Sequence, residues 1–224
     1  PTVRHVSRVH AEDTVDVPVW HVGDEWTYHR VSSMTDWDGN ELWEEDNITY
    51  SVIDIIEEEF NGTKAEVYVM SGFGDVHGYG TANGVGYNMS GTISMTQWIR
   101  VCDLAVMKTE RHVSGIATFG GEQKSYSNDY HILWYNPGEE IYDFPLSVGD
   151  SWSLGSHVFY KGFLTIQDYI SKLYIGDFDD QVNMVCEAYE NKTVTAGSFG
   201  AYRINGTPRA GDSSYPHGQY YWWY

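Results

Sequence analysis

The sequence predicts an all-β protein made of two related antiparallel β units, each a half-barrel or a sandwich-like sheet. Helical spacing of apolar residues is nearly absent, and Gly, Asn, Asp and Pro recur between short alternating segments. In addition, VGDEW at residues 22–26 is matched by VGDSW at residues 148–152, 126 positions later. Further matches in the same order, such as Trp98 with Trp222, indicate an internal duplication.

The N-terminal residues 1–16 precede the first unit. Val3, Val6 and Val9 are separated there by polar residues. This pattern is typical of a terminal tail or of a strand that is donated to a neighbouring molecule.

The first unit is expected to span residues 17–110. Asn61-Gly62 separates two alternating runs and predicts a hairpin turn. Residues 71–91 contain seven glycines, which predicts a flexible glycine–aromatic loop. The strands expected in this unit lie at residues 25–31, 47–60, 65–70 and 92–109.

The second unit is expected to span residues 111–224. Residues 161–174 are ambiguous, because their apolar positions fit a helix as well as a strand. Residues 205–219 read as a loop that matches the glycine-rich segment of the first unit. The strands expected here lie at residues 130–135, 181–188, 193–204 and 220–224.

The order VGD-x-W, hairpin, AGSFGAYRI, polar loop, YYWWY resembles tandem β repeats in secreted archaeal and bacterial proteins. Those repeats carry VGxxW and AGTFxxY motifs and are similar to the half-barrel sheets of the LolA-like superfamily. The first unit departs from the pattern, since AEVYVM stands where the second has AGSFGAYRI. The resemblance implies a curved antiparallel sheet around an apolar face, and it implies no catalytic residues.

Composition excludes some partners. The formal charge is −19, so the chain lacks the basic footprint that nucleic acids require, and anionic membrane surfaces are disfavoured. No apolar run reaches the ~20 residues of a membrane span. The chain begins at Pro1 without a signal peptide, so we expect a processed or trimmed form.

Five Asn-x-Ser/Thr sequons occur among ten asparagines, whereas chance predicts roughly 1.5. They predict N-glycosylation and an extracellular location, although turn chemistry alone also favours Asn beside Ser or Thr. The sequon asparagines are Asn47, Asn61, Asn88, Asn191 and Asn205. Cys102 and Cys186 fall in different units and would form one disulfide in an oxidising compartment, worth ~4 kcal/mol; the alternative is two buried free thiols.

Two acidic clusters are candidate calcium sites, because hard cations prefer oxygen ligands. They comprise Asp36, Asp38 and Asn40, and Asp177, Asp179 and Asp180. The alternative is a solvated acidic edge that discourages unwanted strand pairing. Gly197-Ser198-Phe199-Gly200 lacks the GxSxG pattern of a nucleophile elbow.

These features favour a non-catalytic secreted or cell-surface structural protein that forms a homopolymer, such as a filament, sheath or surface layer. Strand addition between subunits would hold the assembly together. The candidate assembly residues are Val3, Val6, Val9, Tyr220, Tyr221, Trp222 and Trp223. A lipid- or glycan-binding module with a concave sheet face is the alternative, and a hydrolase is a third. No cofactor other than calcium is expected.

Overall fold

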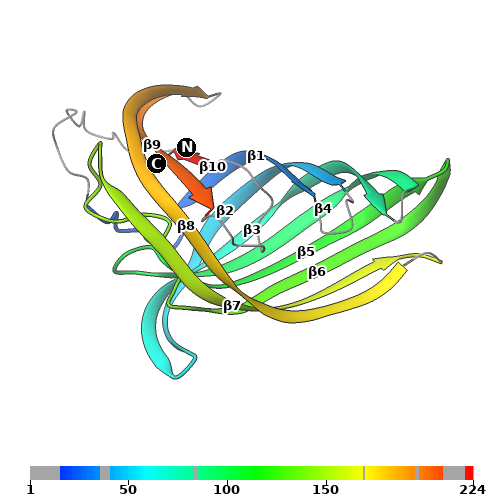
Figure 1. The fold of residues 1–224 in the computed structure, drawn as a ribbon, viewed down its shortest axis with the longest axis horizontal. Coiled ribbons are helices and arrows are strands. Elements are labelled where there is room, and N and C mark those ends of the chain that lie inside the picture. Colours follow the sequence, from blue (N-terminus) through cyan, green and yellow to red (C-terminus); the bar gives the residue numbers. More distant parts are fainter. Residues whose placement is uncertain are drawn as a thin grey trace.

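The computed structural model describes residues 16–35, 41–82, 85–168, 170–194, 197–208 and 220–223. In this part of the chain all regular elements are β-strands (Figure 1). The strands are β1 (Glu25–Thr35), β2 (Glu41–Phe60), β3 (Thr63–Ala82), β4 (Val85–Arg100), β5 (Val106–Phe119), β6 (Glu122–Asn136), β7 (Ser151–Ile166), β8 (Ile170–Val194), β9 (Gly197–Pro208) and β10 (Tyr220–Trp223).

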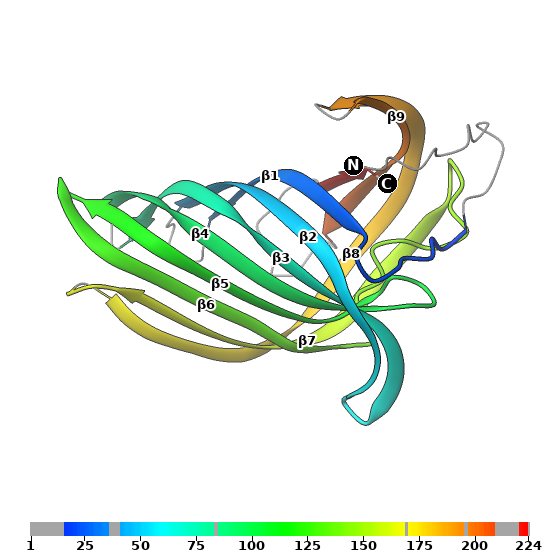
Figure 2. The ribbon, with the colours of Figure 1, turned by 180° about the vertical axis from the view of Figure 1, so that it is seen from behind.

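The strands form one antiparallel sheet in which each strand pairs with its neighbours in sequence, from β1 to β10. Figures 1 and 2 show this sheet as strongly curved, with the tip of the β2–β3 hairpin extending beyond its neighbours. The all-β prediction is confirmed. The expected boundary at residues 110 and 111 lies inside β5 of the continuous sheet, and the internal duplication stays a prediction.

The first VGD-x-W segment forms a tight turn immediately before β1. Gly23 has a φ of +94°, and its N–H donates to the carbonyl of Val52 at 2.8 Å. The carboxylate of Asp24 accepts a hydrogen bond from the backbone N–H of His21 at 2.8 Å. Glycine and aspartate therefore recur in the motif because one allows the positive φ and the other closes the turn.

The second VGD-x-W segment forms the same turn before β7. Gly149 has a φ of +99°, and its N–H donates to the carbonyl of Cys186 at 2.8 Å. The carboxylate of Asp150 accepts from the N–H of Ser147 at 2.7 Å. Each turn is hydrogen-bonded to a strand next to an irregularity in that strand. The β2–β3 register shifts just after Val52, and the β8–β9 register shifts just after Cys186. The motif thus specifies a local structure that begins a strand.

The glycine-rich segment is strand and not loop, so this expectation is wrong. Residues 71–82 continue β3, and β4 begins at Val85. A Cβ at Gly74 would lie 1.8 Å from the carbonyl oxygen of Asn47, and one at Gly72 would lie 2.7 Å from the ring of Tyr50. The glycines allow neighbouring strands and large side chains to approach the backbone of β3 closely. The low β-propensity of glycine alone does not reveal such contacts. The segment 161–174 is ambiguous from the sequence; its residues 161–166 belong to β7 and its residues 170–174 belong to β8, and the two strands pair with each other.

We expect Gly91→Ala to destabilise the fold by about 1–3 kcal/mol, the usual cost of overpacking. Gly91 and Gly115 are directly opposite in β4 and β5, and a Cβ at Gly91 would lie 2.0 Å from the carbonyl oxygen of Ser114. Urea unfolding would measure the change. Gly155→Ala is the matched control, because a Cβ there meets nothing within 4 Å. Equal stability of the two variants would contradict the argument.

One face of the sheet is buried, and we call it the inner face; the opposite face is the outer face. The inner face carries a cluster to which β2 through β7 all contribute. Its buried members are Ile48, Val76, Met89, Ile93, Met95, Val113, Ala117, Phe119, Tyr126 and Ile166. The curvature of the sheet brings these side chains together, so the inner face is covered by the protein's own residues.

The connection between β6 and β7 closes one end of the inner face. Tyr142 and Phe144 pack against two separate clusters, one built on Val52 and Tyr68 and the other on Leu146 and neighbouring strands. Glu139 is anchored to Val106 by two backbone hydrogen bonds of 2.9 and 3.0 Å. Residues 137–150, which we call the plug, therefore join the first strands of the sheet to β7, β8 and β9.

Candidate functional site

The two ends of the sheet are open edges. Among the described strands β1 pairs with β2 alone and β10 pairs with β9 alone. β10 covers only Arg203 to Gly206 of β9, so within the described ranges no strand pairs with residues 197–201 of β9 on that side. An unpaired strand edge presents backbone donors and acceptors to any further strand, and these edges are the candidate interaction sites.

The inner face also holds a buried ion pair between strands that are not neighbours. Arg111 in β5 donates to Glu44 in β2 at 2.8 Å, and both side chains are nearly buried. Beside them, Arg30 in β1 donates through Nε to Asp46 at 2.9 Å. The Oε1 atom of Glu44 and the Oδ1 atom of Asp46 are buried without a hydrogen-bond partner among the described residues. The pairs connect β1 and β5 to β2. They could not be predicted from the sequence, because the partners are far apart in the chain.

A half-buried acidic group, Glu139, lies in the plug. Burial, and then the nearby charge of Asp180, raise the pKa of Glu139 to about 7, while a hydrogen bond with Tyr135 acts in the opposite direction. Asp180 is 1% exposed on the inner face of β8. A carboxyl group with such a pKa holds a proton at mildly acidic pH.

The outer face brings Ser94, His112 and Asp129 into one row across β4, β5 and β6. His112 Nδ1 is hydrogen-bonded to the carboxylate of Asp129. This order resembles the Ser–His–Asp triad of hydrolases. Acyl transfer also requires hydrogen-bond donors that point at the developing oxyanion. The backbone amides of this region face along the sheet toward neighbouring strands, so the row by itself describes a polar surface.

The sequon asparagines lie on the surface with one exception. Four of them are exposed on β2, the β2–β3 turn, β4 and β8, namely Asn47, Asn61, Asn88 and Asn191. Asn205 is half-buried in β9, and its amide donates to Glu187 at 2.7 Å. Asn61 has a φ of +47° at the tip of the predicted hairpin, which is confirmed. Glycosylation of these residues stays a prediction.

The candidate calcium residues of β8 do not converge. Asp177 and Asp179 lie on the outer face, where both contact His157, whereas Asp180 points to the inner face. Successive side chains of a strand point to opposite faces, so the run Asp179-Asp180 cannot act as one ligand set. In the described ranges no group of three or more His, Cys, Asp or Glu side chains could hold a metal ion. Asp36, Asp38 and Asn40 lie outside the described residues.

The predicted disulfide between Cys102 and Cys186 is wrong, because both residues are free thiols. Cys102 is exposed in the turn between β4 and β5, while Cys186 is buried in β8, with three strands between these positions in the sheet order. Sequence spacing placed the two cysteines in different units but carried no information about their separation across the sheet.

The predicted assembly residues are placed only in part. Tyr220, Tyr221, Trp222 and Trp223 form β10 at the open edge, which confirms a C-terminal strand. The register places Trp223 opposite Arg203 of β9. Val3, Val6 and Val9 lie outside the described residues.

Comparison with known proteins gives no relative: no family model, no curated protein and no solved structure matches the chain. The resemblance to LolA-like half-barrels therefore stays a prediction. The part of the chain that the structure describes contains no long apolar helix of the kind that crosses a membrane.

Proposed function

We propose that this protein is a non-catalytic structural subunit of an extracellular homopolymer, in which copies are joined by strand addition. A strand from the N-terminal segment of one copy, residues 1–16, would complete the β9–β10 edge of the next copy. This contact joins two different surfaces, so it leads to an open-ended chain of subunits rather than a closed dimer.

The observation that carries this proposal is the unequal length of the last two strands. β9 has twelve residues and β10 has four, which leaves residues 197–201 of β9 open in the described part of the chain. Added main-chain hydrogen bonds supply affinity in such a contact, and alternate side chains supply specificity. The sequons and the aromatic C-terminal residues are consistent with an extracellular assembly.

A lipid carrier that uses the inner face is less well supported. Ile48, Val76 and Ile93 are each at most 1% exposed, so this face is already covered by protein side chains. A ligand-binding cavity of ordinary size, about 300–1,000 Å³, would require these side chains to be displaced.

We expect Val9→Asp to weaken assembly of the full-length protein, because a charge would replace one of the apolar side chains that the added strand would bury. Electron microscopy and light scattering over a concentration series would measure assembly. The protein concentration required for assembly should rise at least about tenfold, which is equivalent to a loss of ~1.4 kcal/mol in the free energy of association. Assembly of the unmodified protein should strengthen with salt, since each copy carries a charge of −19.

His10→Asp is the matched control, because it adds the same charge at a polar position that lies on the opposite face of an extended strand from Val9, and this variant should still assemble. A native protein that stays monomeric at every concentration and salt level would contradict the proposal. So would unimpaired assembly of the Val9→Asp variant.

A further inference from the structure

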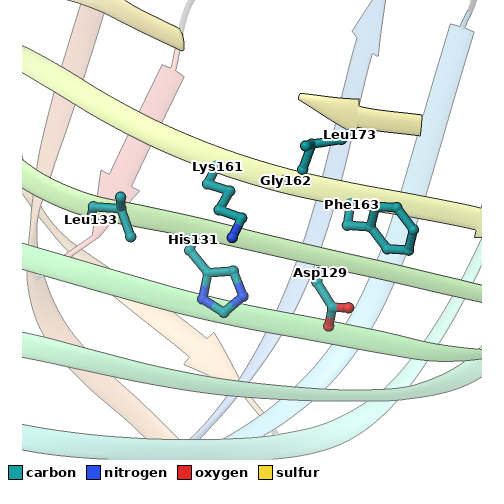
Figure 3. A pocket seen from close by; sticks show the side chains of 7 residues that line it. All are labelled: Asp129, His131, Leu133, Lys161, Gly162, Phe163 and Leu173. Carbon is teal, nitrogen blue, oxygen red and sulfur yellow. The ribbon is translucent and has the colours of Figure 1, made fainter. Parts of the chain in front are cut away.

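The outer face of the sheet has a shallow hollow of about 450 Å³ over β6, β7 and β8. Figure 3 shows that its side chains come from alternate positions of these strands, so they stand on the same face. The register puts His131 and Lys161 into one row, and Asp129, Phe163 and Leu173 into the next row on the same face. The lining residues are Asp129, His131, Leu133, Lys161, Gly162, Phe163 and Leu173.

One row contains a lysine whose ammonium group forms no ion pair with the described residues. Lys161 lies directly opposite His131, and in Figure 3 its side chain extends toward that imidazole. Lys161 is exposed and forms no ion pair with any described residue, although the chain has a net charge of −19. By contrast, Lys108 and Arg203 pair with glutamates on their own or neighbouring strands. An unpaired ammonium group in an acidic protein is a binding point for an anionic group.

The other row supplies an apolar platform next to a carboxylate. Phe163 lies between Asp129 and Leu173 in the cross-strand register. Phe163 is 40% exposed and Leu173 is 54% exposed, so the ring and the leucine offer apolar surface to solvent. Asp129 is held in place by its hydrogen bond to His112 and retains oxygen atoms that can accept further bonds.

We propose that this hollow binds an acidic carbohydrate, with a uronic acid residue as the unit recognised. The carboxylate would pair with Lys161 and His131, the apolar face of the sugar ring would stack on Phe163, and a hydroxyl group would donate to Asp129. A sugar combines these needs, because it has one apolar face, several hydroxyl donors and, in a uronic acid, one negative charge. The site is separate from the β9–β10 edge and does not depend on assembly.

The combination of groups selects against other ligands. A nucleic acid would bring many phosphates toward a protein of charge −19 with a single open lysine in this hollow, so repulsion would dominate. A neutral sugar would leave the ammonium group of Lys161 without a partner. The expected preference is therefore for acidic over neutral oligosaccharides of the same length.

The test uses the full-length protein and a galactose oligosaccharide that carries a single galacturonic acid residue, so that the ligand brings one negative charge, with the neutral galactose oligosaccharide of equal length for comparison. Titration calorimetry at low ionic strength should detect binding of the acidic oligomer and at least tenfold weaker binding of the neutral one. Lys161→Gln should weaken binding of the acidic oligomer at least tenfold, and Phe163→Ala should weaken binding of both oligomers.

Two matched controls separate the hollow from the rest of the surface. Phe73→Ala removes another exposed aromatic ring of the outer face, and Lys64→Gln removes a lysine from the β2–β3 hairpin. Both controls should bind as the native protein does. Failure to bind the acidic oligomer at millimolar concentration, equal affinity for both oligomers, or equal losses in the control variants would each overturn the proposal.

Discussion

Replacement of Arg111 by alanine is expected to lower the free energy of unfolding by about 3–5 kcal/mol, the usual cost of removing one member of a buried ion pair. The substitution would leave the carboxylate of Glu44 buried on the inner face without the cation that is hydrogen-bonded to it. Its Oε1 atom already lacks a hydrogen-bond partner among the described residues, so no neighbour stands ready to compensate. Urea unfolding monitored by tryptophan fluorescence would measure the loss.

A double variant distinguishes the cost of an orphaned charge from the loss of packing. Arg111→Met combined with Glu44→Leu should restore most of the stability, because a well-packed apolar pair avoids the desolvation penalty of both charges. Lys64→Ala provides the exposed control, since the Lys64–Glu57 pair lies in solvent and is worth at most about 1 kcal/mol. If Arg111→Ala were as mild as Lys64→Ala, the pair would not be buried in solution.

The second large effect concerns pH and Glu139. The pKa of Glu139 is raised from 4.5 to about 7 in the folded protein, first by burial and then by the charge of Asp180. The folded state therefore binds a proton more tightly than the unfolded state. Below about pH 4.5 the group is protonated in both states and costs nothing. As pH rises toward 7, ionisation in the folded state is penalised, and by about pH 8 the full penalty of about 3 kcal/mol is present.

We therefore expect Glu139→Gln to be about as stable as the native protein near pH 4 and about 3 kcal/mol more stable at pH 8. Unfolding free energies measured across this range, taken as the difference between the two proteins, would isolate the contribution of this one group. Glu140→Gln is the matched control, because Glu140 is exposed and pairs with Arg100 at 2.9 Å. A difference between Glu139→Gln and the native protein that does not change with pH would contradict the assignment.

The sequence determined the local structure of this protein to a large extent. Alternation of apolar residues predicted β-strands, Asn61-Gly62 predicted the β2–β3 hairpin, and each VGD-x-W segment begins a strand through the same turn. These features depend on residues close together in the chain, so their physical chemistry is visible in the sequence. The loop predicted from the glycines of β3 is wrong because the cause lies far away in the chain. Gly74 is required where the backbone of β3 closely approaches the neighbouring strand.

Only the tertiary structure decided which distant residues meet. It joined the strands into one continuous sheet, paired Arg111 with Glu44 across the inner face, and placed Glu139 near Asp180. It also separated Cys102 from Cys186 and split Asp179 from Asp180 onto opposite faces. Pairing across a sheet depends on register and curvature, and a shift of one residue exchanges the two faces. The candidate edges and the outer hollow are products of that register, which local sequence patterns do not specify.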